Sequence, residues 1–291
     1  MTEKTQAFAL SVIVPVYNGA ATLAEQLEAL SAQQWERPWE VLVVNNASTD
    51  ATAEIAAEFA ARSSLFRVAE ASDGHNLSYV RNVGVGLANG RSVAFCDADD
   101  VIADGWVAAI GEALETNPLV GSRLEYERLN MVKESGASRF GSTGFASMFG
   151  YPLVTGAGMG CQVSLWDALG GNDESWDATG EDFEFSIRAV RDRGAEPYFV
   201  EDAVYHYRLR EDTRSMFRQN RRYGRSHARL YKEFGSREYR SPIMKSLRHD
   251  AALLWRLGDL RHPSRRVAWA RSAGKRLGRL EGSVRYRTLY L

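Results

Sequence analysis

Residues 7–46 read AFALSVIVPVYNGAATLAEQLEALSAQQWERPWEVLVVNN, and this stretch decides the fold class. It opens on a β-branched apolar run that is too short for a helix and is typical of a strand buried on both faces. Residues 21–33 then carry leucines at helical spacing, and residues 40–46 form a second apolar run that ends in Asn45 and Asn46. The stretch therefore predicts a strand, a helix and a second strand parallel to the first.

The same alternation continues over the next fifty residues or so. We expect a helix that is capped within residues 47–50 and ends at Ala61, followed by a strand at 65–69, a helix at 78–88 and a strand at 91–96. The predicted fold class is α/β, with three layers around a mostly parallel central sheet. Ligands of such sheets bind at the carboxyl ends of the strands, where this sequence places polar clusters.

The rest of the chain divides into two stretches of different character. From residue 119 to residue 204 the pattern is less regular and richer in glycine, and we expect strands and loops with one helix at 181–193. After Arg210, apolar side chains recur at helical spacing, which predicts a helical extension. The predicted parts are residues 8–118, residues 119–210 and a basic α-helical extension over residues 211–291.

The composition limits both the class of protein and its compartment. Hydrophobic residues make up 45% and charged residues 25%, which excludes a disordered or low-complexity chain. Two separated cysteines, Cys96 and Cys161, exclude a disulfide scaffold and a cysteine-based zinc site. No apolar run is long enough to span a bilayer, and residues 1–6 carry no apolar signal region. We therefore expect a cytoplasmic protein.

The formal net charge of −1 conceals a division along the chain. From Arg208 to the end there are 23 Lys and Arg against 7 Asp and Glu, or +16, whereas residues 1–207 carry 13 against 30, or −17. Such an asymmetry indicates that the C-terminal segment meets an anionic surface, of a partner or of its own chain.

The most informative motif is FCDADD at residues 95–100, where an apolar strand ends in three carboxylates. Carboxylates this close repel one another unless a cation or several hydrogen-bond donors compensate them. Oxygen ligands of this kind suit Mg²⁺ or Mn²⁺. An isolated acidic turn would be a solvated loop, but this one ends a predicted central strand, where ligands bind. The motif therefore predicts a divalent-cation site.

With this motif the chain resembles the family 2 glycosyltransferases of the GT-A fold. The matching stretches, in order, are SVIVPVYNGAATLAEQLEAL, EVLVVNNASTDAT, NLSYVRNVGVGLANG, VAFCDADD, and GEDFEFSIRAVRDRG with VYHYR. They cover Leu10 to Arg208, and their order and spacing carry the resemblance rather than any single motif. The resemblance implies a GT-A-type three-layer sandwich that uses a nucleotide-diphosphate sugar.

The resemblance assigns donor binding to Pro15, Tyr17, Asn18, Asn46, Arg81 and Asp97. Asn46 stands where the family commonly has an aspartate that accepts from the uracil N3–H. Its amide can still accept this bond and can donate to O4, but it carries no charge. UDP is therefore the first expectation, while dTDP and GDP are less excluded than usual. Arg81 either pairs with the diphosphate or forms an ion pair on the helix surface.

The resemblance also assigns the metal ligands. Asp99 matches the carboxylate that ligates Mn²⁺ or Mg²⁺, and Asp97 lies near the ribose and diphosphate. Asp100 is either a supporting carboxylate or a solvated one. His206 matches a position that approaches the metal or diphosphate in relatives, and the alternative is a structural, hydrogen-bonded histidine.

The acidic pair that begins the helix at 181–193 is the expected catalytic group. Asp182 matches the base that takes the acceptor hydroxyl's proton in an inverting transfer, and Glu181 matches the neighbour that orients the acceptor. The alternative is a pair of first-turn acids that complement the helix dipole. Trp176 either gives a bound sugar an apolar face or belongs to the core.

Two glycine-rich stretches superficially suggest dinucleotide loops. Gly84 and Gly86 lie inside a predicted helix, and residues 156–160 follow no clean strand–turn–helix start, so both fail the context that such a loop requires. Residues 156–160 are expected instead to allow close packing beside the acceptor site.

These assignments predict an inverting, metal-dependent glycosyltransferase whose acceptor is a cell-envelope, polysaccharide or lipid-linked glycan. A metal-dependent nucleotidyltransferase is the alternative enzyme, although it would need a basic residue in the loop after the first strand, and residues 17–21 have none. A nucleic-acid-binding protein that uses the basic C-terminus is the non-enzymatic alternative. Its basic residues lie on helices that have apolar faces of their own, so no nucleic acid is expected.

The basic extension carries one further expectation. A predicted amphipathic helix combines Arg218, Arg221, Arg222, Arg225 and Arg229 with Phe217, Tyr223 and Leu230. Such a helix can lie in the headgroup plane of an anionic membrane. We therefore expect salt-sensitive, peripheral contact with the inner face of the cell membrane, the alternatives being internal pairing with the acidic part of the chain and a nucleic-acid site.

Overall fold

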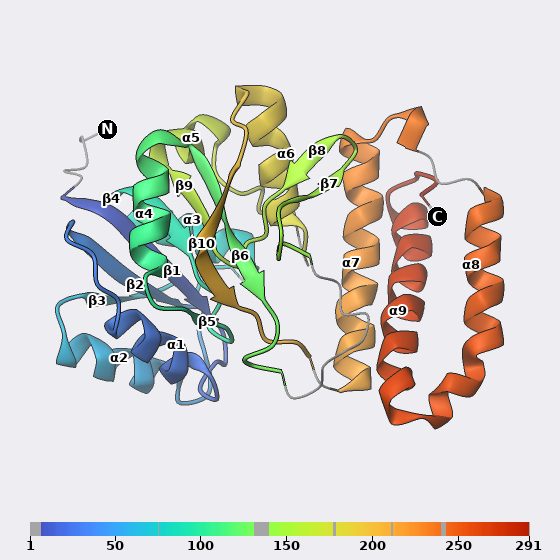
Figure 1. The fold of residues 1–291 in the computed structure, drawn as a ribbon, viewed down its shortest axis with the longest axis horizontal. Helices are drawn as coiled ribbons and strands as arrows, with labels where there is room; N and C mark the ends of the chain where they lie inside the picture. Colours follow the sequence, from blue (N-terminus) through green and yellow to red (C-terminus); the bar gives the residue numbers. More distant parts are fainter. Residues whose placement is uncertain are drawn as a thin grey trace. The chain divides into compact units, whose positions relative to one another are not determined.

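The structure is a computed structural model that describes residues 7–74, 76–130, 140–176, 179–210, 212–239 and 243–290. The chain forms two compact units, which Figure 1 colours along the sequence. The first unit takes in the chain up to residue 176 together with residues 181–209, and the second takes in residues 177–180 and 210–291.

The first unit is built on a mixed sheet. In the described part of the chain this sheet has eight strands in the order β3-β2-β1-β4-β9-β6-β10-β5. Their bounds are β1 Phe8–Val16, β2 Trp39–Asn45, β3 Phe66–Glu70, β4 Gly90–Phe95, β5 Val101–Ile102, β6 Leu119–Glu125, β9 Met159–Gln162 and β10 Tyr198–His206. The pairs among β1 to β4 and the pair β6 and β10 are parallel, whereas β9 and β5 run antiparallel to their neighbours. A separate hairpin pairs β7 (Ala146–Met148) with β8 (Tyr151–Leu153).

Helices cover both faces of the sheet (Figure 1). One face packs against α1 (Leu23–Ser31), α2 (Thr52–Arg62) and α4 (Trp106–Thr116), and the other against α3 (Leu77–Leu87), α5 (Val163–Leu169) and α6 (Glu181–Arg193). Alternate residues of β1 supply the two cores, with Val12 and Val14 on one face and Ile13 on the other. Burial on both faces explains the unbroken apolar run of this strand, and it confirms the three-layer α/β prediction.

The structure corrects two local expectations. One helix was expected between residues 119 and 204, but α5 precedes α6 there. With seven residues, α5 is too short to show a helical period, so only its tertiary contacts reveal it. The N-cap of α2 is Ala51, one residue after the expected range, and its side chain makes no capping bond. Asp50, within that range, accepts from the backbone N–H of Thr52 at the start of the helix and from that of Ala20.

The second unit is helical, as expected. It contains α7 (Thr213–Phe234), α8 (Ile243–Trp255) and α9 (Pro263–Arg285), with short 3₁₀ turns η1 (Arg237–Tyr239) and η2 (Arg256–Arg261). The helices α7 and α9 approach so closely that a Cβ added at Gly278 would lie 2.0 Å from the carbonyl oxygen of Arg221, and one at Gly224 would lie 2.2 Å from that of Lys275. Only glycine fits at these contacts.

The packing of α7 differs from the expectation that this helix lies in a lipid headgroup plane. Leu230 is fully buried, and Phe217 and Tyr223 are half-buried. Two of the arginines expected to face lipid form ion pairs within the unit, Arg221 with Glu281 on α9 and Arg229 with Glu233 on α7. None of the helices in the described residues is long and apolar enough to cross a membrane.

Candidate active site

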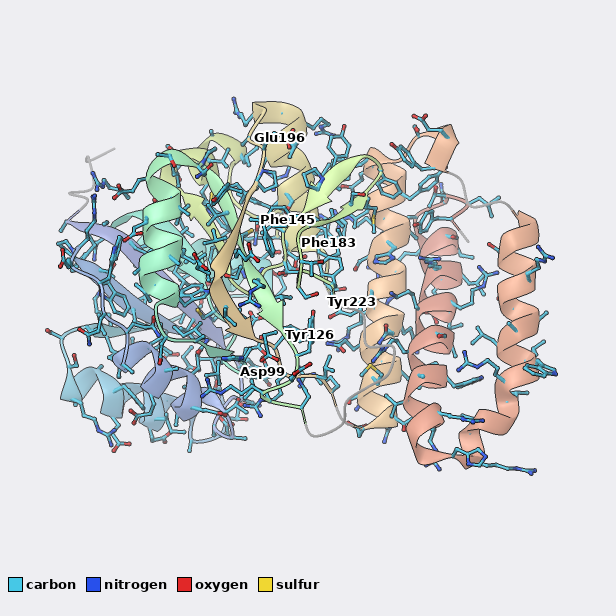
Figure 2. All side chains as sticks on the ribbon, in the orientation of Figure 1. Asp99, Tyr126, Phe145, Phe183, Glu196 and Tyr223 are labelled. Atoms are coloured by element: carbon cyan, nitrogen blue, oxygen red, sulfur yellow. The ribbon has the colours of Figure 1, made fainter. Side chains whose placement is uncertain are left out.

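The acidic residues singled out in the sequence gather at the carboxyl edge of the sheet. Asp97 and Asp99 follow β4, while Glu181 and Asp182 open α6. Figure 2 shows Asp99 at the same end of the sheet as Tyr126, the residue that follows β6. This is the edge at which parallel sheets bind ligands.

Arg81, on α3, connects the two acidic groups. Its Nη1 donates to Glu181 Oε1 at 3.0 Å, and its Nη2 lies 3.6 Å from Asp97 Oδ1. The side chain is 1% exposed, and its guanidinium lies 5.3 Å from the ring centroid of Phe95. A buried guanidinium is tolerated only where anionic partners compensate its charge, as here. The ion pair is therefore internal rather than on the helix surface, and contact of Arg81 with a diphosphate stays a prediction.

Gly156 makes room for this arrangement. Its backbone N–H donates to Asp182 Oδ2 at 2.7 Å, and a Cβ at this position would lie 2.2 Å from Arg81 Nη2. A larger residue would therefore push the guanidinium away from its two carboxylate partners. The close packing expected for residues 156–160 is confirmed at Gly156.

Burial raises the pKa of both carboxyls at the start of α6. For Glu181 the neighbouring charge of Asp182 raises the pKa further, and the Arg81 guanidinium opposes the shift. For Asp182 the opposing influences are Arg81 and the backbone N–H groups of Gly156 and Phe183, which bond its two oxygens. A carboxylate with a raised pKa is a stronger base, which suits proton abstraction.

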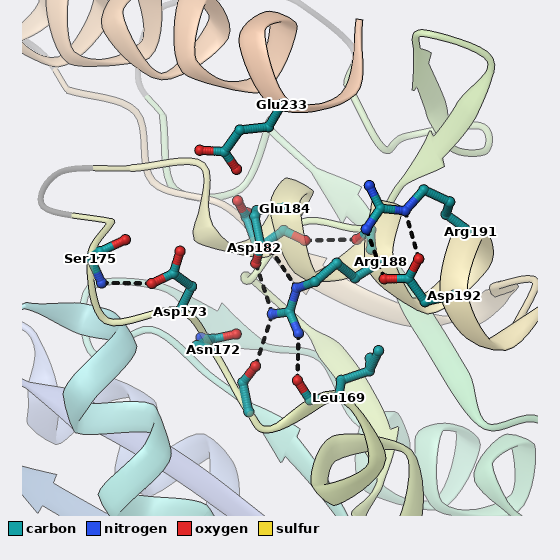
Figure 3. A network of polar contacts seen from close by, with 12 residues as sticks. Leu169, Asn172, Asp173, Ser175, Asp182, Glu184, Arg188, Arg191, Asp192 and Glu233 are labelled. Atoms are coloured by element: carbon teal, nitrogen blue, oxygen red, sulfur yellow. Dashed lines mark hydrogen bonds and ion pairs between the residues drawn. The ribbon is translucent and has the colours of Figure 1, made fainter. Parts of the chain in front are cut away.

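A second arginine holds α6 in place (Figure 3). Arg188 donates to the carbonyl oxygens of Leu169 at 2.7 Å and Gly171 at 2.8 Å, and it pairs with Glu184 on its own helix. These bonds tie α6 to the end of α5. They therefore help to hold α6, whose first turn carries Glu181 and Asp182, in its position within the first unit.

The acidic turn after β4 contains a buried carboxylate. Asp100 is 2% exposed, so the solvated alternative is wrong. Its Oδ1 accepts from the backbone N–H of Arg208 at 2.7 Å, but its Oδ2 has no hydrogen-bond partner among the described residues. Burial and the charges of Asp97 and Asp99 raise the pKa of Asp100 well above its usual range.

The donor set of this turn fits a divalent cation in its chemistry. Three carboxylates crowd one turn, and one of their buried oxygens lacks a donor, which is the situation that a hard cation relieves. Within the described ranges no group of three or more His, Cys, Asp or Glu side chains is arranged to hold a metal ion. A cation here would thus take further ligands from a substrate, as Mg²⁺ commonly does.

His206 forms the structural contacts that were its alternative assignment. Its Nδ1 lies 2.5 Å from Glu125 Oε2, and its Nε2 lies 3.2 Å from Arg128 Nη1. Because a guanidinium only donates, we assign the proton to Nδ1 and the lone pair to Nε2. That lone pair faces Arg128, so metal ligation by His206 stays a prediction.

Arg208 and Tyr205 also support the acidic turn, and both were missed as functional residues. Arg208 Nε donates to the carbonyl oxygen of Asp99 at 2.7 Å, and its Nη2 pairs with Glu25 at 2.6 Å. The Tyr205 hydroxyl accepts from the Asp97 backbone N–H at 2.8 Å. Both lie in the VYHYR stretch at residues 204–208, and this stretch is the sequence feature that could have indicated them.

Hydrogen bonds join the loops after β1 and β2, where nucleotide binding was expected. Asn18 has a left-handed backbone (φ +50°), which asparagine tolerates better than most residues. Its N–H donates to Ser48 Oγ, and its Oδ1 accepts from the Thr49 N–H. Tyr17 beside it is 63% exposed, whereas Pro15 is buried in β1. The nucleotide contacts of these residues stay predictions.

Asn46 is 8% exposed at the end of β2. The hydrogen-bonding network assigns its amide nitrogen to the carbonyl oxygens of Ala71 and Gly74, at 2.6 and 2.8 Å. Its oxygen is then turned away from these carbonyls. Trp176 is 3% exposed, so protein encloses its ring, and this favours the core assignment over sugar stacking.

Comparisons with known proteins point to one family. Residues 11–151 match the family model described as Glycosyl transferase family 2. The uncharacterized glycosyltransferase EpsJ of Bacillus subtilis is 33% identical over 110 residues, which cover 38% of this chain and 31% of that protein. The uncharacterized glycosyltransferase YibD of Escherichia coli is 37% identical over 93 residues, covering 32% and 26%. The matches thus span between a quarter and a third of the length of these curated relatives.

Solved structures share the fold at low sequence identity. The mannosyltransferase PcManGT from Pyrobaculum calidifontis, in complex with GDP-Man and Mn²⁺, superimposes with a TM-score of 0.62 at 20% identity and covers 97% of this chain and 76% of that one. The 1–349 structure of S. aureus TarS gives 0.54 at 19% identity, with 97% and 93% covered. These likenesses confirm the GT-A-type fold.

Proposed function

We propose, on the premise that this chain carries a glycosyl transferase family 2 domain over residues 11–151, that the protein is an inverting glycosyltransferase. It moves a sugar from a nucleotide-diphosphate donor to a hydroxyl group of an acceptor. The observation that carries this proposal is the Arg81 guanidinium, which joins Asp97 on the donor side to Glu181 on the expected acceptor side. Asp182, the candidate base, lies next to this bridge.

The donor that we propose first is a UDP-sugar. A fixed amide at Asn46 supports it, because its oxygen is turned away from Ala71 and Gly74 and so can accept a base N–H. Among the structural neighbours, S. aureus TarS 1–349 was solved in complex with UDP-GlcNAc and the mannosyltransferase PcManGT in complex with GDP-Man. GDP, like dTDP, therefore remains in the donor screen described below.

The proposed chemistry is a single displacement. The Asp182 carboxylate takes the proton of the acceptor hydroxyl, whose oxygen attacks the anomeric carbon while the bond to the donor's diphosphate breaks. Backbone N–H groups of Gly156 and Phe183 hold the carboxylate in one orientation, and burial raises its pKa. Glu181, paired with Arg81, orients the acceptor.

Asp99 would hold a Mn²⁺ or Mg²⁺ ion, and the donor's diphosphate would complete its coordination. When bound, the cation supplies positive charge against the departing diphosphate. The buried Asp100 oxygen without a donor supports cation binding at this turn.

The acceptor that we propose is a glycan of the cell envelope, a polysaccharide or a lipid-linked sugar. Support for the polysaccharide option comes from a match to the chondroitin synthase of Escherichia coli, 32% identical over 117 residues, which covers 39% of this chain and 17% of that protein.

The first experiment is a screen for donors. Thermal shifts are measured with UDP-, dTDP- and GDP-sugars, each with Mn²⁺ and with EDTA. A donor that binds should stabilise the fold, and more so with Mn²⁺. Equal shifts with Mn²⁺ and EDTA would remove the metal from the proposal, and no shift with any donor would contradict the function itself.

The second experiment tests the base. Asp182→Asn should lower transfer about 10²- to 10⁴-fold while the affinity for UDP, measured by calorimetry, stays close to wild type. The matched control is Asp192→Asn at the exposed end of the same helix, which should leave transfer unchanged. NMR of the product should show an inverted anomeric centre, and a retained configuration would overturn the single displacement.

A further inference from the structure

The end of α8 and the 3₁₀ turn η2 that follows it expose four apolar side chains. Leu254 is 67% exposed, Trp255 88%, Leu257 47% and Leu260 37%. Single exposed apolar residues are ordinary on protein surfaces, but several at the junction of two elements indicate a contact surface. Leu254, Trp255, Leu257 and Leu260 are together called the apolar turn below.

The end of α8 is not frayed, because residues beside the apolar turn bond α8 to α9. The Arg276 guanidinium on α9 pairs with both carboxylate oxygens of Asp250 on α8, at 2.5 and 2.6 Å. The Trp269 indole donates to the carbonyl oxygen of Leu253 at 3.0 Å. These contacts hold one side of the end of α8 against α9, while Leu254 and Trp255 stay in solvent.

The flanks of the apolar turn are basic. Residues 248–271 hold six arginines against two aspartates, and one of these acids, Asp250, is paired with Arg276. Three of the arginines, Arg261, Arg265 and Arg266, are exposed directly after the apolar turn. Apolar side chains flanked by exposed guanidinium groups complement a surface that has an apolar interior and an anionic face.

We propose that the apolar turn and the arginines after it dock this protein on an anionic lipid surface. Trp255 suits the headgroup level, where its ring meets acyl chains and its indole N–H meets water. Arg261, Arg265 and Arg266 lie where they can contact lipid phosphates. The inference does not rest on the proposed function, and it moves the expected membrane contact from α7 to the turn between α8 and α9.

The test uses the full chain and co-sedimentation with vesicles of phosphatidylcholine, with and without phosphatidylglycerol, at low and high NaCl. The protein should pellet with phosphatidylglycerol vesicles at low salt and be released at high salt. Leu254→Ser with Trp255→Ser should lower the partition coefficient about tenfold or more. Both residues are exposed, so the fold should be retained, which circular dichroism checks.

Two control variants test whether vesicle binding depends on this surface rather than on any exposed apolar or charged residue. Val284→Ser removes an apolar residue that is 81% exposed elsewhere on α9, and Arg222→Gln removes an exposed charge on α7. Both should bind vesicles like the wild type, whereas Arg261→Gln with Arg265→Gln should weaken binding and flatten its salt dependence.

Three results would overturn the proposal. The wild type could stay in the supernatant with phosphatidylglycerol vesicles at low salt, or the Leu254/Trp255 variant could pellet as the wild type does. In the third result, sedimentation velocity without lipid shows a wild-type dimer that the Leu254/Trp255 variant abolishes, which assigns the surface to a second copy of the chain.

Discussion

At the scale of the residue, Asp100 is a buried carboxyl group whose ionised form costs stability. Its carboxylate is buried beside two other carboxylates, and one of its oxygens has no donor within the described residues. The pKa of Asp100 is raised because burial and the charges of Asp97 and Asp99 disfavour its ionised form. A group that costs stability in the free protein is typical of a site shaped for a ligand.

Asp100→Asn should therefore stabilise the protein at neutral pH. A folded-state pKa above the unfolded value means that the wild type loses stability as the pH rises through the folded-state pKa, and a neutral amide avoids this loss. Urea unfolding in EDTA should show the variant more stable by about 1–2 kcal/mol at neutral pH. The difference should shrink as the pH is lowered towards the unfolded value of about 3.9. Equal stability of the two proteins at every pH would contradict this account.

The sequence identifies the chemistry of these residues better than their contacts. The positions of Asp97, Asp99, Glu181 and Asp182 after a strand and at a helix start follow from local pattern. The bond from Arg81 to Glu181 joins residues 100 positions apart, and no spacing rule predicts it. His206 is a second example, because its partners Glu125 and Arg128 lie on or just after another strand of the sheet, and only the folded chain brings them together.

At the scale of the element, α3 shows how two glycines in one helix differ. A Cβ at Gly84 would lie 2.6 Å from Ile13 Cγ2 on β1, whereas a Cβ at Gly86 would meet nothing within 4 Å. Gly84 therefore lets the helix approach the sheet, whereas the space beside Gly86 would admit a side chain. The sequence places both inside a helix, but only the packing of α3 on β1 tells them apart.

These two glycines give a matched pair of variants. Gly84→Ala should destabilise the first unit by about 1–3 kcal/mol, since the core must move to admit a methyl group. Gly86→Ala should stabilise it by about 0.5–1 kcal/mol, because alanine favours the helix. Chemical denaturation of both variants measures the difference, and shifts of the same sign would argue against the close approach of α3 to β1.

At the scale of the whole molecule, the chain consists of two compact units with different kinds of core. The first relies on apolar side chains on both faces of a sheet, and the apolar runs of its strands predict most of these core residues. The second relies on backbone contact between α7 and α9 at Gly224 and Gly278. Sequence periodicity predicts these helices, but it does not predict how closely they approach each other.

Gly278→Ala should therefore destabilise the second unit selectively. The added Cβ would lie 2.0 Å from the Arg221 carbonyl oxygen, so the helices must separate. We expect a loss of about 1–3 kcal/mol, seen as faster amide hydrogen exchange in α7 and α9 with little change in β1 and β2. Gly258→Ala, whose Cβ would meet nothing within 4 Å, is the control. Equally accelerated exchange in both units would contradict a local effect.

The Arg81 bridge has a thermodynamic consequence. One guanidinium serves both Asp97 and Glu181, so a change of charge at either carboxylate alters what remains for the other. Such coupling is reciprocal: a ligand that alters the charge at Asp97 shifts the proton affinity of Glu181, and protonation of Glu181 shifts that ligand's affinity by the same factor. Nucleotide affinity should therefore vary with pH, and Glu181→Gln should weaken this dependence although Glu181 itself is not assigned to the nucleotide. Asp100 and Asp182 should carry the remainder, because the charge of Asp97 also raises their pKa values.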